Sequence, residues 1–579
     1  MWELLWLVVS VSSEVLVIDN IVTISTDPTP NVTDENPWNN YSRMIQTDAT
    51  LEDLTHVIET EHGRVRGYED DGIIKYFDIP YGAFSEERPF QESSKPQSWE
   101  TILEKMEHTS RCPQINSSNE YVGNNDCLTL NIFKPQNADN AEVLFHIHES
   151  YFHTGSGDPS VYGPRYLVPE GIILVLPNYR LGPLGFLCLQ NETAPGNAGL
   201  KDLTLALKWT ADNIEAFGGN ASKIVVSGSG AAGVLAEYLL LSNSSKSFIS
   251  KAITESGSTL SEWALDRNPL EAAKCLVDKL LETERNYRTA NINDIFEQIT
   301  IAELVRAANG IDFRPCIELE AGFLSESPWS LLQSYKSEIP YMLGSANQAA
   351  MDIALQYNTE ESLAQFNLDP ALLLPNDLLF ENDEQKNIGE QVKAHYFGEN
   401  NITLNDIGNL SQCFSDSKYV YPGIRAARSF AKAGSILYFY EFSYGNLRPI
   451  SGAARGDFTG FVFSSEESNI ASHSNENSDR TQNIIRVLWV NFIKTGDPST
   501  ANLRWNNLND VTEAEEEWLS IGDEVMMQQS FHVDRLKLWK DIYENHFMEN
   551  NLGDDLKPSN YITLFSLMLL FDFYKNLKL

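Results

Sequence analysis

A glycine-dense turn between an apolar run and a helical segment is where this sequence is expected to carry out chemistry. Residues 223–226 (KIVV) form a β-branched run, and an apolar segment of helical character begins at Gly233. A strand, a sharp turn and a helix present a nucleophilic serine when the turn reads G-x-S-x-G. Residues 228–232 read GSGAA, so the residue at the apex is Gly230. Glycine has no side chain, and no covalent acyl-enzyme forms there.

A register shifted by one residue would make Ser229 the nucleophile. The residue before the apex of such a turn points away from the substrate side. The Val225-Val226 pair and Gly233 on either side also fix the register. We therefore expect Gly230 at the apex and keep Ser229 as the alternative.

The elements that must position this turn are short apolar strands alternating with helices. A helix is predicted over residues 198–217, where apolar side chains recur on one face, and an antiparallel pair over residues 65–67 and 73–77. Alternation of strands and helices predicts a mostly parallel sheet covered on both faces. The other predicted strands are residues 142–148, 171–176, 223–228, 252–254, 341–343 and 436–442.

The chain divides into four predicted segments. Residues 1–18 begin with a short apolar run that is typical of a secretory signal peptide, and residues 19–55 form a polar linker. Residues 56–545 have globular character, and residues 546–579 form a tail. The tail contains an apolar run, residues 561–571, about half the length that spans a bilayer. A lipid-anchor signal there is the alternative to an ordinary terminal segment.

Composition bounds the partners and the compartment. The formal charge is −39, from 42 basic and 81 acidic residues, which disfavours nucleic acid and anionic membranes. Six cysteines and eight N-x-S/T sequons beside a leader predict an oxidising, extracellular setting. The candidate glycosylation sites are Asn31, Asn40, Asn116, Asn191, Asn220, Asn243, Asn401 and Asn409.

Residues 56–545 resemble the type B carboxylesterase/cholinesterase family through several motifs in family order. The motifs are residues 62–67 (HGRVRG), 79–81 (IPY), 112–114 (CPQ), 126–131 (DCLTLN), 178–186 (NYRLGPLGF), 194–197 (APGN), 255–258 (ESGS) and 494–498 (KTGDP). The resemblance implies the α/β-hydrolase fold, with a large, mostly parallel central sheet flanked by helices. It also implies a disulfide between Cys112 and Cys127. The other four cysteines then allow three pairings.

The resemblance locates the remaining members of a catalytic triad. The acid is expected in the segment after the strand at 341–343, where the matching residue is Ala349 and the nearest carboxylate is Asp352. The base is expected after the strand at 436–442, where the matching residue is Arg455. Arginine stays protonated near neutral pH and cannot accept a proton.

The oxyanion-hole motif of the family is also altered. Where the family has H-G-G-G, this chain has His148, Glu149, Ser150 and Tyr151. Glu149 adds negative charge where an anion must be stabilised. Loss of one triad member costs about 10⁴ to 10⁶ in kcat, and loss of one oxyanion donor about 10² to 10³. The sequence therefore predicts a protein that is not an enzyme.

A metal site is the alternative use of the histidines near this motif. His146, His148, Glu149 and His153 lie close together in the sequence, but their spacing matches no standard ligand set. Packing in the core or cleft is the simpler interpretation. We expect no metal and no cofactor.

Three functions remain. The resemblance extends to the catalytically inactive neuroligin-, neurotactin-, gliotactin- and glutactin-like proteins, which implies a secreted, non-catalytic glycoprotein that binds an extracellular or cell-surface protein in adhesion. The first alternative is a carrier that holds a hydrophobic small ligand in the former active-site gorge, whether that gorge is open or plugged. The second alternative is residual carboxylic-ester hydrolysis.

Overall fold

The computed structural model describes most of the globular segment. The described residues are 55–283, 295–296, 298–318, 322–381, 383–445, 450–465, 476–508 and 516–547. The chain separates into two compact units, residues 1–55 and 56–579. The predicted signal peptide, all but the last residue of the linker, and the apolar run at 561–571 lie outside the described residues. None of the helices in the described part is long and apolar enough to cross a bilayer.

An eleven-stranded mixed sheet forms the centre of the second unit, in the order β16-β15-β14-β13-β12-β11-β9-β10-β8-β4-β3. The strands from β10 to β15 pair in parallel, and antiparallel strands complete both edges. The sheet confirms the predicted α/β-hydrolase class. Its strands are β3 (Tyr68–Asp70), β4 (Ile73–Pro80), β8 (Thr129–Pro135), β9 (Ala141–His146), β10 (Ile173–Pro177), β11 (Gly219–Ser229), β12 (Lys251–Glu255), β13 (Tyr341–Ala346), β14 (Leu437–Phe442), β15 (Glu517–Ile521) and β16 (Val525–Gln529).

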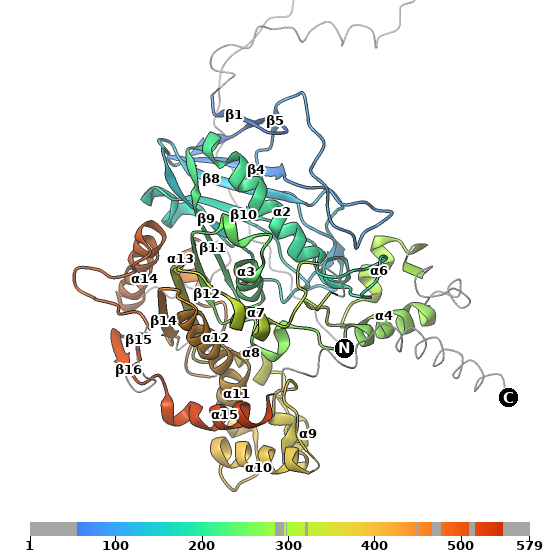
Figure 1. Cartoon of the computed structure of the whole chain (residues 1–579), viewed down its shortest axis with the longest axis vertical. Coiled ribbons are helices and arrows are strands. Elements are labelled where there is room, and N and C mark those ends of the chain that lie inside the picture. Colours follow the sequence, from blue (N-terminus) through green and yellow to red (C-terminus); the bar gives the residue numbers. More distant parts are fainter. Residues whose placement is uncertain are drawn as a thin grey trace, which may run out of the picture. The chain divides into compact units, whose positions relative to one another are not determined.

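Helices flank this sheet (Figure 1). Helix α3 contacts β11 and β12, α12 contacts β13 and β14, and α14 contacts β9. Every residue of α3 is buried, because it follows the central strand and is covered by other helices. The helices are α1 (Gly182–Phe186), α2 (Ala198–Asn213), α3 (Ala231–Leu241), α4 (Pro269–Thr283), α6 (Ile301–Ala307), α7 (Pro328–Ser334), α8 (Met351–Ala354), α9 (Glu360–Leu368), α10 (Glu384–Phe397), α11 (Ile407–Ser415), α12 (Tyr421–Lys432), α13 (Thr459–Val462), α14 (Glu476–Thr495) and α15 (Val533–His546).

The N-terminal strands correct one prediction. Residues 65–67 and 73–77 were expected to pair, but β2 (Gly63–Arg66) pairs with β1 (Val57–Thr60) and β5 (Leu103–Glu104) in a separate sheet. The hairpin partner of β4 is instead β3. The short β3 strand after Gly67 has few apolar side chains and so gave a weak strand signal. A third, two-stranded sheet joins β6 (Gln114–Ile115) and β7 (Tyr121–Val122).

Two disulfides cross-link the second unit. Cys112 bonds to Cys127, and Cys188 bonds to Cys316 across 128 residues of sequence. Cys275 and Cys413 are free thiols. Of the pairings that the sequence left open, the structure therefore contains one bond.

The sheet topology brings the candidate site together. Parallel strands place their carboxyl ends along one edge, which is where open α/β sheets bind ligands. The segments that follow β9, β11, β13 and β14 contain Glu149, Gly230, Ala349 and Arg455 in turn. All four positions that matter for an esterase thus follow strands in the parallel part of the sheet, where β12 separates β11 from β13.

Candidate functional site

The turn between β11 and α3 is built around a backbone conformation that suits glycine. Gly230 has φ +56° and ψ −123°, a region that side chains of L-amino acids rarely adopt. Its amide donates a hydrogen bond of 2.8 Å to the Glu255 carbonyl, which ties the turn to β12. Ser229 is buried, and its hydroxyl donates to the Glu255 carboxylate. The alternative nucleophile is therefore directed toward β12.

The Glu149 side chain lies where a side chain at residue 230 would extend. A Cβ atom added to Gly230 would lie 2.4 Å and 2.6 Å from the two Glu149 carboxylate oxygens, and 2.8 Å from Cδ of Arg455. Both oxygens are shielded from solvent, and backbone hydrogen bonds from Ala231 and Tyr151 help to stabilise the ionised carboxylate. Burial raises the pKa of Glu149 to about 7, although the positive charge of Arg455 opposes the shift. The space beside the apex is thus filled by charged side chains.

Arg455 is held by three neighbours. One terminal nitrogen donates to the Tyr419 hydroxyl at 2.9 Å, and the other donates to Asp352 Oδ2 at 2.9 Å. Its guanidinium carbon lies 4.0 Å from the centroid of the Tyr151 ring, within the range of a cation–π contact. Burial lowers the pKa of Arg455, but its acidic neighbours, including Tyr419 and Glu149, outweigh burial and raise it. Residue 455 stays a cation and cannot serve as a base.

Tyr151 links this buried cluster to the surface. Its hydroxyl donates to Asp352 Oδ2 at 2.6 Å, and the residue is 51% exposed. Tyr151 and the following Phe152 both have positive φ angles, +48° and +66°. Such angles are uncommon for bulky residues. We name the set Glu149, Tyr151, Asp352, Tyr419 and Arg455 the apex cluster.

The other predicted site residues take no part in the hydrogen bonds that join the side chains of the apex cluster. Ala349 is fully buried in the core. His148 is buried and stacks on Tyr179, with ring centroids 4.5 Å apart. The Ser150 hydroxyl accepts a hydrogen bond of 2.8 Å from the Tyr179 hydroxyl. These residues support the loop after β9 and leave Glu149 as the polar side chain next to the apex.

The histidines of this region have separate partners. His146 contacts the Ser227 hydroxyl at 2.8 Å, and the His153 Nε2 lies 3.6 Å from Asp312. Burial lowers the pKa values of His146 and His148 to about 3. Among the residues that the structure describes, no three His, Cys, Asp or Glu side chains gather as metal ligands. The metal alternative gains no support from this geometry.

Tyr419 and Glu255 also contribute to the site, although the sequence assigned neither of them a role there. Tyr419 lies in the π-helical segment η11 (Asp416–Val420), between α11 and α12. Glu255 lies at the end of β12, where burial raises the pKa of its carboxyl group. The Glu255 position was visible as part of the ESGS motif, but no motif marked Tyr419.

The arrangement permits two kinds of chemistry. A buried carboxyl with a pKa near 7 is suited to accept or donate a proton, and Glu149 meets this description. A fixed guanidinium stabilises a developing negative charge. The same charges make a poor lining for an apolar molecule, so the alternative of a hydrophobic ligand beside Gly230 stays a prediction.

Comparisons with known proteins place these residues in context. The model of the "Carboxylesterase family" matches residues 54–539. Esterase FE4 of Myzus persicae is 28% identical over 491 residues, covering 77% of this chain and 86% of that protein. Neuroligin-2 of Mus musculus is 24% identical, covering 84% of this chain and 67% of that protein. The juvenile hormone esterase structure from Manduca sexta has a TM-score of 0.73 at 24% identity, covering 84% of this chain and 99% of that one.

These relatives correct one expectation from the sequence. The altered triad predicted that the chain is not an enzyme, yet most of the named relatives are esterases, including Esterase FE4 and the juvenile hormone esterase of Tribolium castaneum. The relationship to named hydrolases suggests enzymatic activity and overturns that prediction. The solved structures, at 24% identity, show the shared fold.

Proposed function

The chain belongs to the carboxylesterase family, and we propose that it acts outside the cell by binding a cell-surface or matrix protein in adhesion. The observation that carries this proposal is the apex cluster. Glu149 and Arg455 occupy the space beside Gly230, so the surface available to a large partner is the outer face of the fold. The resemblance to neuroligin-like proteins supports the same role.

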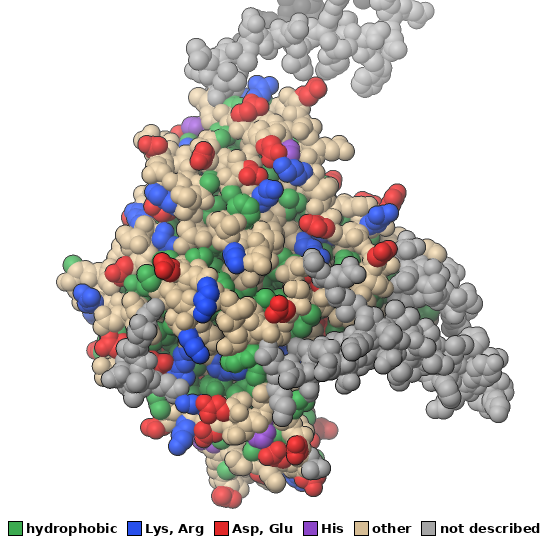
Figure 2. Space-filling model, in the orientation of Figure 1, with side chains coloured by type: hydrophobic (Ala, Val, Ile, Leu, Met, Phe, Trp, Pro, Cys, Tyr) green, Lys and Arg blue, Asp and Glu red, His purple; other side chains and the backbone are tan. Residues whose placement is uncertain are grey.

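Several features support an extracellular location. The two disulfides suit an oxidising compartment. Six of the eight sequons lie in the described part, and each of those asparagines is partly or fully exposed. They are Asn116, Asn191, Asn220, Asn243, Asn401 and Asn409. Figure 2 shows acidic and basic side chains interspersed over the face in view, a surface that favours solubility.

A binding screen tests the proposal. The purified, glycosylated full chain is presented to arrays of cell-surface and matrix proteins and to intact cells. We expect saturable binding to at least one protein component. Absence of saturable binding to every surface and matrix component would contradict the proposed function.

Ester hydrolysis is the second candidate, favoured by the position of Glu149. The Glu149 carboxylate is shielded from solvent in the structure, so this reaction requires it first to become accessible. Glu149 then accepts a proton from a water molecule as the water oxygen attacks the ester carbonyl. The charge of Arg455 stabilises the tetrahedral oxyanion, and the protonated Glu149 returns its proton to the departing alkoxide. A pKa of about 7 allows Glu149 to act in both directions near neutral pH.

Turnover of p-nitrophenyl acetate tests this second candidate. We expect hydrolysis that increases with pH through about 7 and is lost in Glu149→Gln, which keeps the shape of the side chain but removes the base. Labelling with an organophosphate distinguishes a serine mechanism, because a stoichiometric serine adduct would assign the reaction to a serine such as Ser229. Turnover that is equal in wild type and Glu149→Gln would exclude Glu149 as the base.

A further inference from the structure

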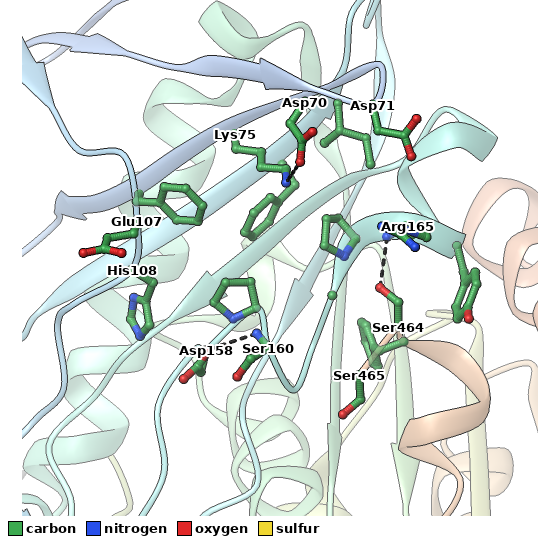
Figure 3. Close-up of a pocket in the computed structure, with 18 of the residues that line it drawn as sticks. Asp70, Asp71, Lys75, Glu107, His108, Asp158, Ser160, Arg165, Ser464 and Ser465 are labelled. Atoms are coloured by element: carbon green, nitrogen blue, oxygen red, sulfur yellow. Dashed lines mark hydrogen bonds and ion pairs between the residues drawn. The ribbon is translucent and has the colours of Figure 1, made fainter. Parts of the chain in front are cut away.

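Two hollows of the described surface differ in charge. The larger, about 860 Å³, lies beside the β3–β4 hairpin and carries charged side chains at both ends, among them Asp71 and Glu107 (Figure 3). The second, about 590 Å³, lies between the end of α8, the start of α11 and the residues that begin at Ile450. None of the described residues that line this second hollow is charged. We name it the neutral hollow, and its exposed residues are Leu355, Asn358, Leu404, Asn405, Asn409 and Ser451.

Two leucines on the walls of the neutral hollow leave apolar surface uncovered. Leu355 is 38% exposed and Leu404 is 42% exposed, and the half-buried Tyr357 and Ile407 line the same hollow. Single exposed leucines are ordinary on a protein surface, but these two share one concave site. Covering such surface stabilises a protein in proportion to the apolar area removed from water. The neutral hollow therefore favours an occupant with an apolar face.

The polar side chains of the neutral hollow suit an occupant with hydroxyl groups. Asn358, Asn405 and Ser451 are exposed, and none of their side chains is hydrogen-bonded to another described residue. Each amide offers both donors and an acceptor, and the hydroxyl offers one donor and two acceptors. An ion would find no opposite charge among the described walls. A neutral compound with hydroxyl groups and apolar faces fits both kinds of wall, and a sugar is such a compound.

A glycosylation sequon forms part of the wall of the neutral hollow. Asn409 begins the triplet Asn409-Leu410-Ser411, it is exposed, and it lines the hollow. The asparagine of such a triplet accepts an N-linked glycan in a secreted protein. The first two sugars of that glycan are N-acetylglucosamine, which is uncharged and has hydroxyl groups, an amide and apolar ring faces. Because the link to Asn409 holds these sugars at the wall, they do not incur the entropy loss of a free ligand.

We propose that the N-linked glycan of Asn409 packs its two core N-acetylglucosamine residues into the neutral hollow and covers Leu355 and Leu404. The volume of about 590 Å³ lies within the range of about 300–1,000 Å³ that holds drug-sized molecules, and a disaccharide is of that size. This glycan is then part of the packed structure. The inference needs passage through the secretory pathway, as the proposed extracellular function does, but it does not depend on adhesion.

Two other sequons provide a comparison within the same molecule. Asn401 and Asn243 are exposed, and neither lines the neutral hollow. Their glycans are expected to extend into solvent. Glycans at the three sites are attached in the same way, so differences between them in the folded protein report the surrounding protein surface.

Enzymatic deglycosylation of the native full chain tests the inference. The chain is secreted from cells that keep glycans in the high-mannose form. Endoglycosidase H, which cuts between the two core sugars, is then added, and peptide mass spectrometry follows each site. We expect removal from Asn409 to be at least about tenfold slower than from Asn401 and Asn243, with equal rates in the unfolded protein. An unoccupied Asn409, or equal rates in the native protein, would overturn the proposal.

A pair of leucine variants tests contact between the glycan and the wall. Leu404→Ser removes an apolar side chain from the neutral hollow. Leu368→Ser makes the same change in α9, at a leucine that is 81% exposed and does not line the hollow. We expect Leu404→Ser to speed removal from Asn409 at least about threefold and Leu368→Ser to leave the rate within about twofold. The same rate in both variants would contradict the contact.

Thermal melting distinguishes packing of the glycan from mere shielding of its attachment point, because only packing stabilises the fold. Asn409→Gln keeps the amide and loses the glycan, and Asn401→Gln is the matched control. We expect the melting temperature to fall by about 2–5 °C in Asn409→Gln and to change by less than about 1 °C in Asn401→Gln. Equal melting temperatures of Asn409→Gln and wild type would overturn the proposal.

A second variant removes the same sequon without changing Asn409. In Ser411→Ala the triplet is lost, and the Ser411 hydroxyl is buried without a hydrogen-bond partner among the described residues. Removal of such a hydroxyl does not by itself lower stability. The same fall in melting temperature is therefore expected, and it would be caused by the lost glycan. A Ser411→Ala variant as stable as wild type would count against a packed glycan.

Occupancy of the sequons separates this inference from the proposed function. Glycans on Asn401 and Asn243 with none on Asn409 would refute the packed glycan and leave the extracellular role intact. Absence of glycans from every sequon would refute the packed glycan too, and it would also count against passage through the secretory pathway, on which the proposed function depends.

Discussion

Returning a serine to the apex should destabilise the protein because of the residue that now lies beside it. In Gly230→Ser, the new Cβ atom would lie 2.4 Å and 2.6 Å from the Glu149 carboxylate oxygens. Contacts below 3.0 Å do not persist, so Glu149 or the turn must move. The φ of +56° adds backbone strain for any residue with a side chain.

The magnitude follows from these two effects. Overpacking of a filled site costs about 1–3 kcal/mol, and a side chain in a sparsely populated backbone region costs about 1–3 kcal/mol. Truncation in Glu149→Ala removes the carboxylate from contact with residue 230 and leaves the backbone strain. Gly230→Ser should therefore cost about 2–6 kcal/mol alone and about 1–3 kcal/mol in the Glu149→Ala background.

A double-mutant cycle measures this coupling. The free energies of unfolding of wild type, both single variants and the double variant are obtained from urea titrations. We expect a coupling free energy of about 1–3 kcal/mol between the two sites. Additive effects, or a Gly230→Ser variant as stable as wild type, would refute the conclusion that Glu149 occupies the space of the missing side chain.

Three further perturbations follow from the structure. Burial raises the pKa of Glu149 from an ordinary 4.5 to about 7 in the folded state. The contribution of this group to the free energy of unfolding should therefore fall by about 3 kcal/mol as pH rises from about 4.5 to 7, and stay level above 7. Urea titrations of Glu149→Gln should lack this fall, and identical pH profiles for the variant and the wild type would contradict the prediction. Arg455→Gln removes the cation between Glu149 and Asp352, and thermal melting should show a loss of about 2–4 kcal/mol in the free energy of unfolding. The control Lys494→Gln, at an exposed cation, should change this free energy by less than about 0.5 kcal/mol. Equal effects of the two variants would argue against a structural role for Arg455. Replacement of Cys188 and Cys316 by serine opens a loop of 128 residues and should lower the free energy of unfolding, measured by chemical denaturation, by about 3–5 kcal/mol. Cys275→Ser, at an exposed free thiol, is the control. A double variant as stable as that control would count against a stabilising disulfide between Cys188 and Cys316.

The fold was accessible from the sequence because its signals are local and repeated. The β-branched run before Gly228 and the apolar run at 436–442 each became a central strand, β11 and β14. The placement of Gly230 at the apex of the turn follows from the same local pattern of residues. The β2–β4 pairing was wrong because adjacent runs in sequence favour a hairpin, whereas β2 pairs with strands of a different sheet.

The contacts of the apex cluster could not be predicted, because they join side chains from distant segments. Asp352 was noted as the nearest carboxylate to Ala349, yet its partner is Arg455, 103 residues away. Tyr419 comes from a π-helical segment that has no sequence signature. A motif comparison shows which groups are absent at a position, and the structure shows that Glu149 fills the space that remains.

A binding isotherm measured in parallel for wild type and Glu149→Gln tests the central claim most directly. The account predicts saturable binding of the purified chain to a cell-surface or matrix protein, with the same dissociation constant for both proteins, because the interface lies outside the apex cluster. Loss of binding in Glu149→Gln, or no saturable binding by wild type, would contradict it.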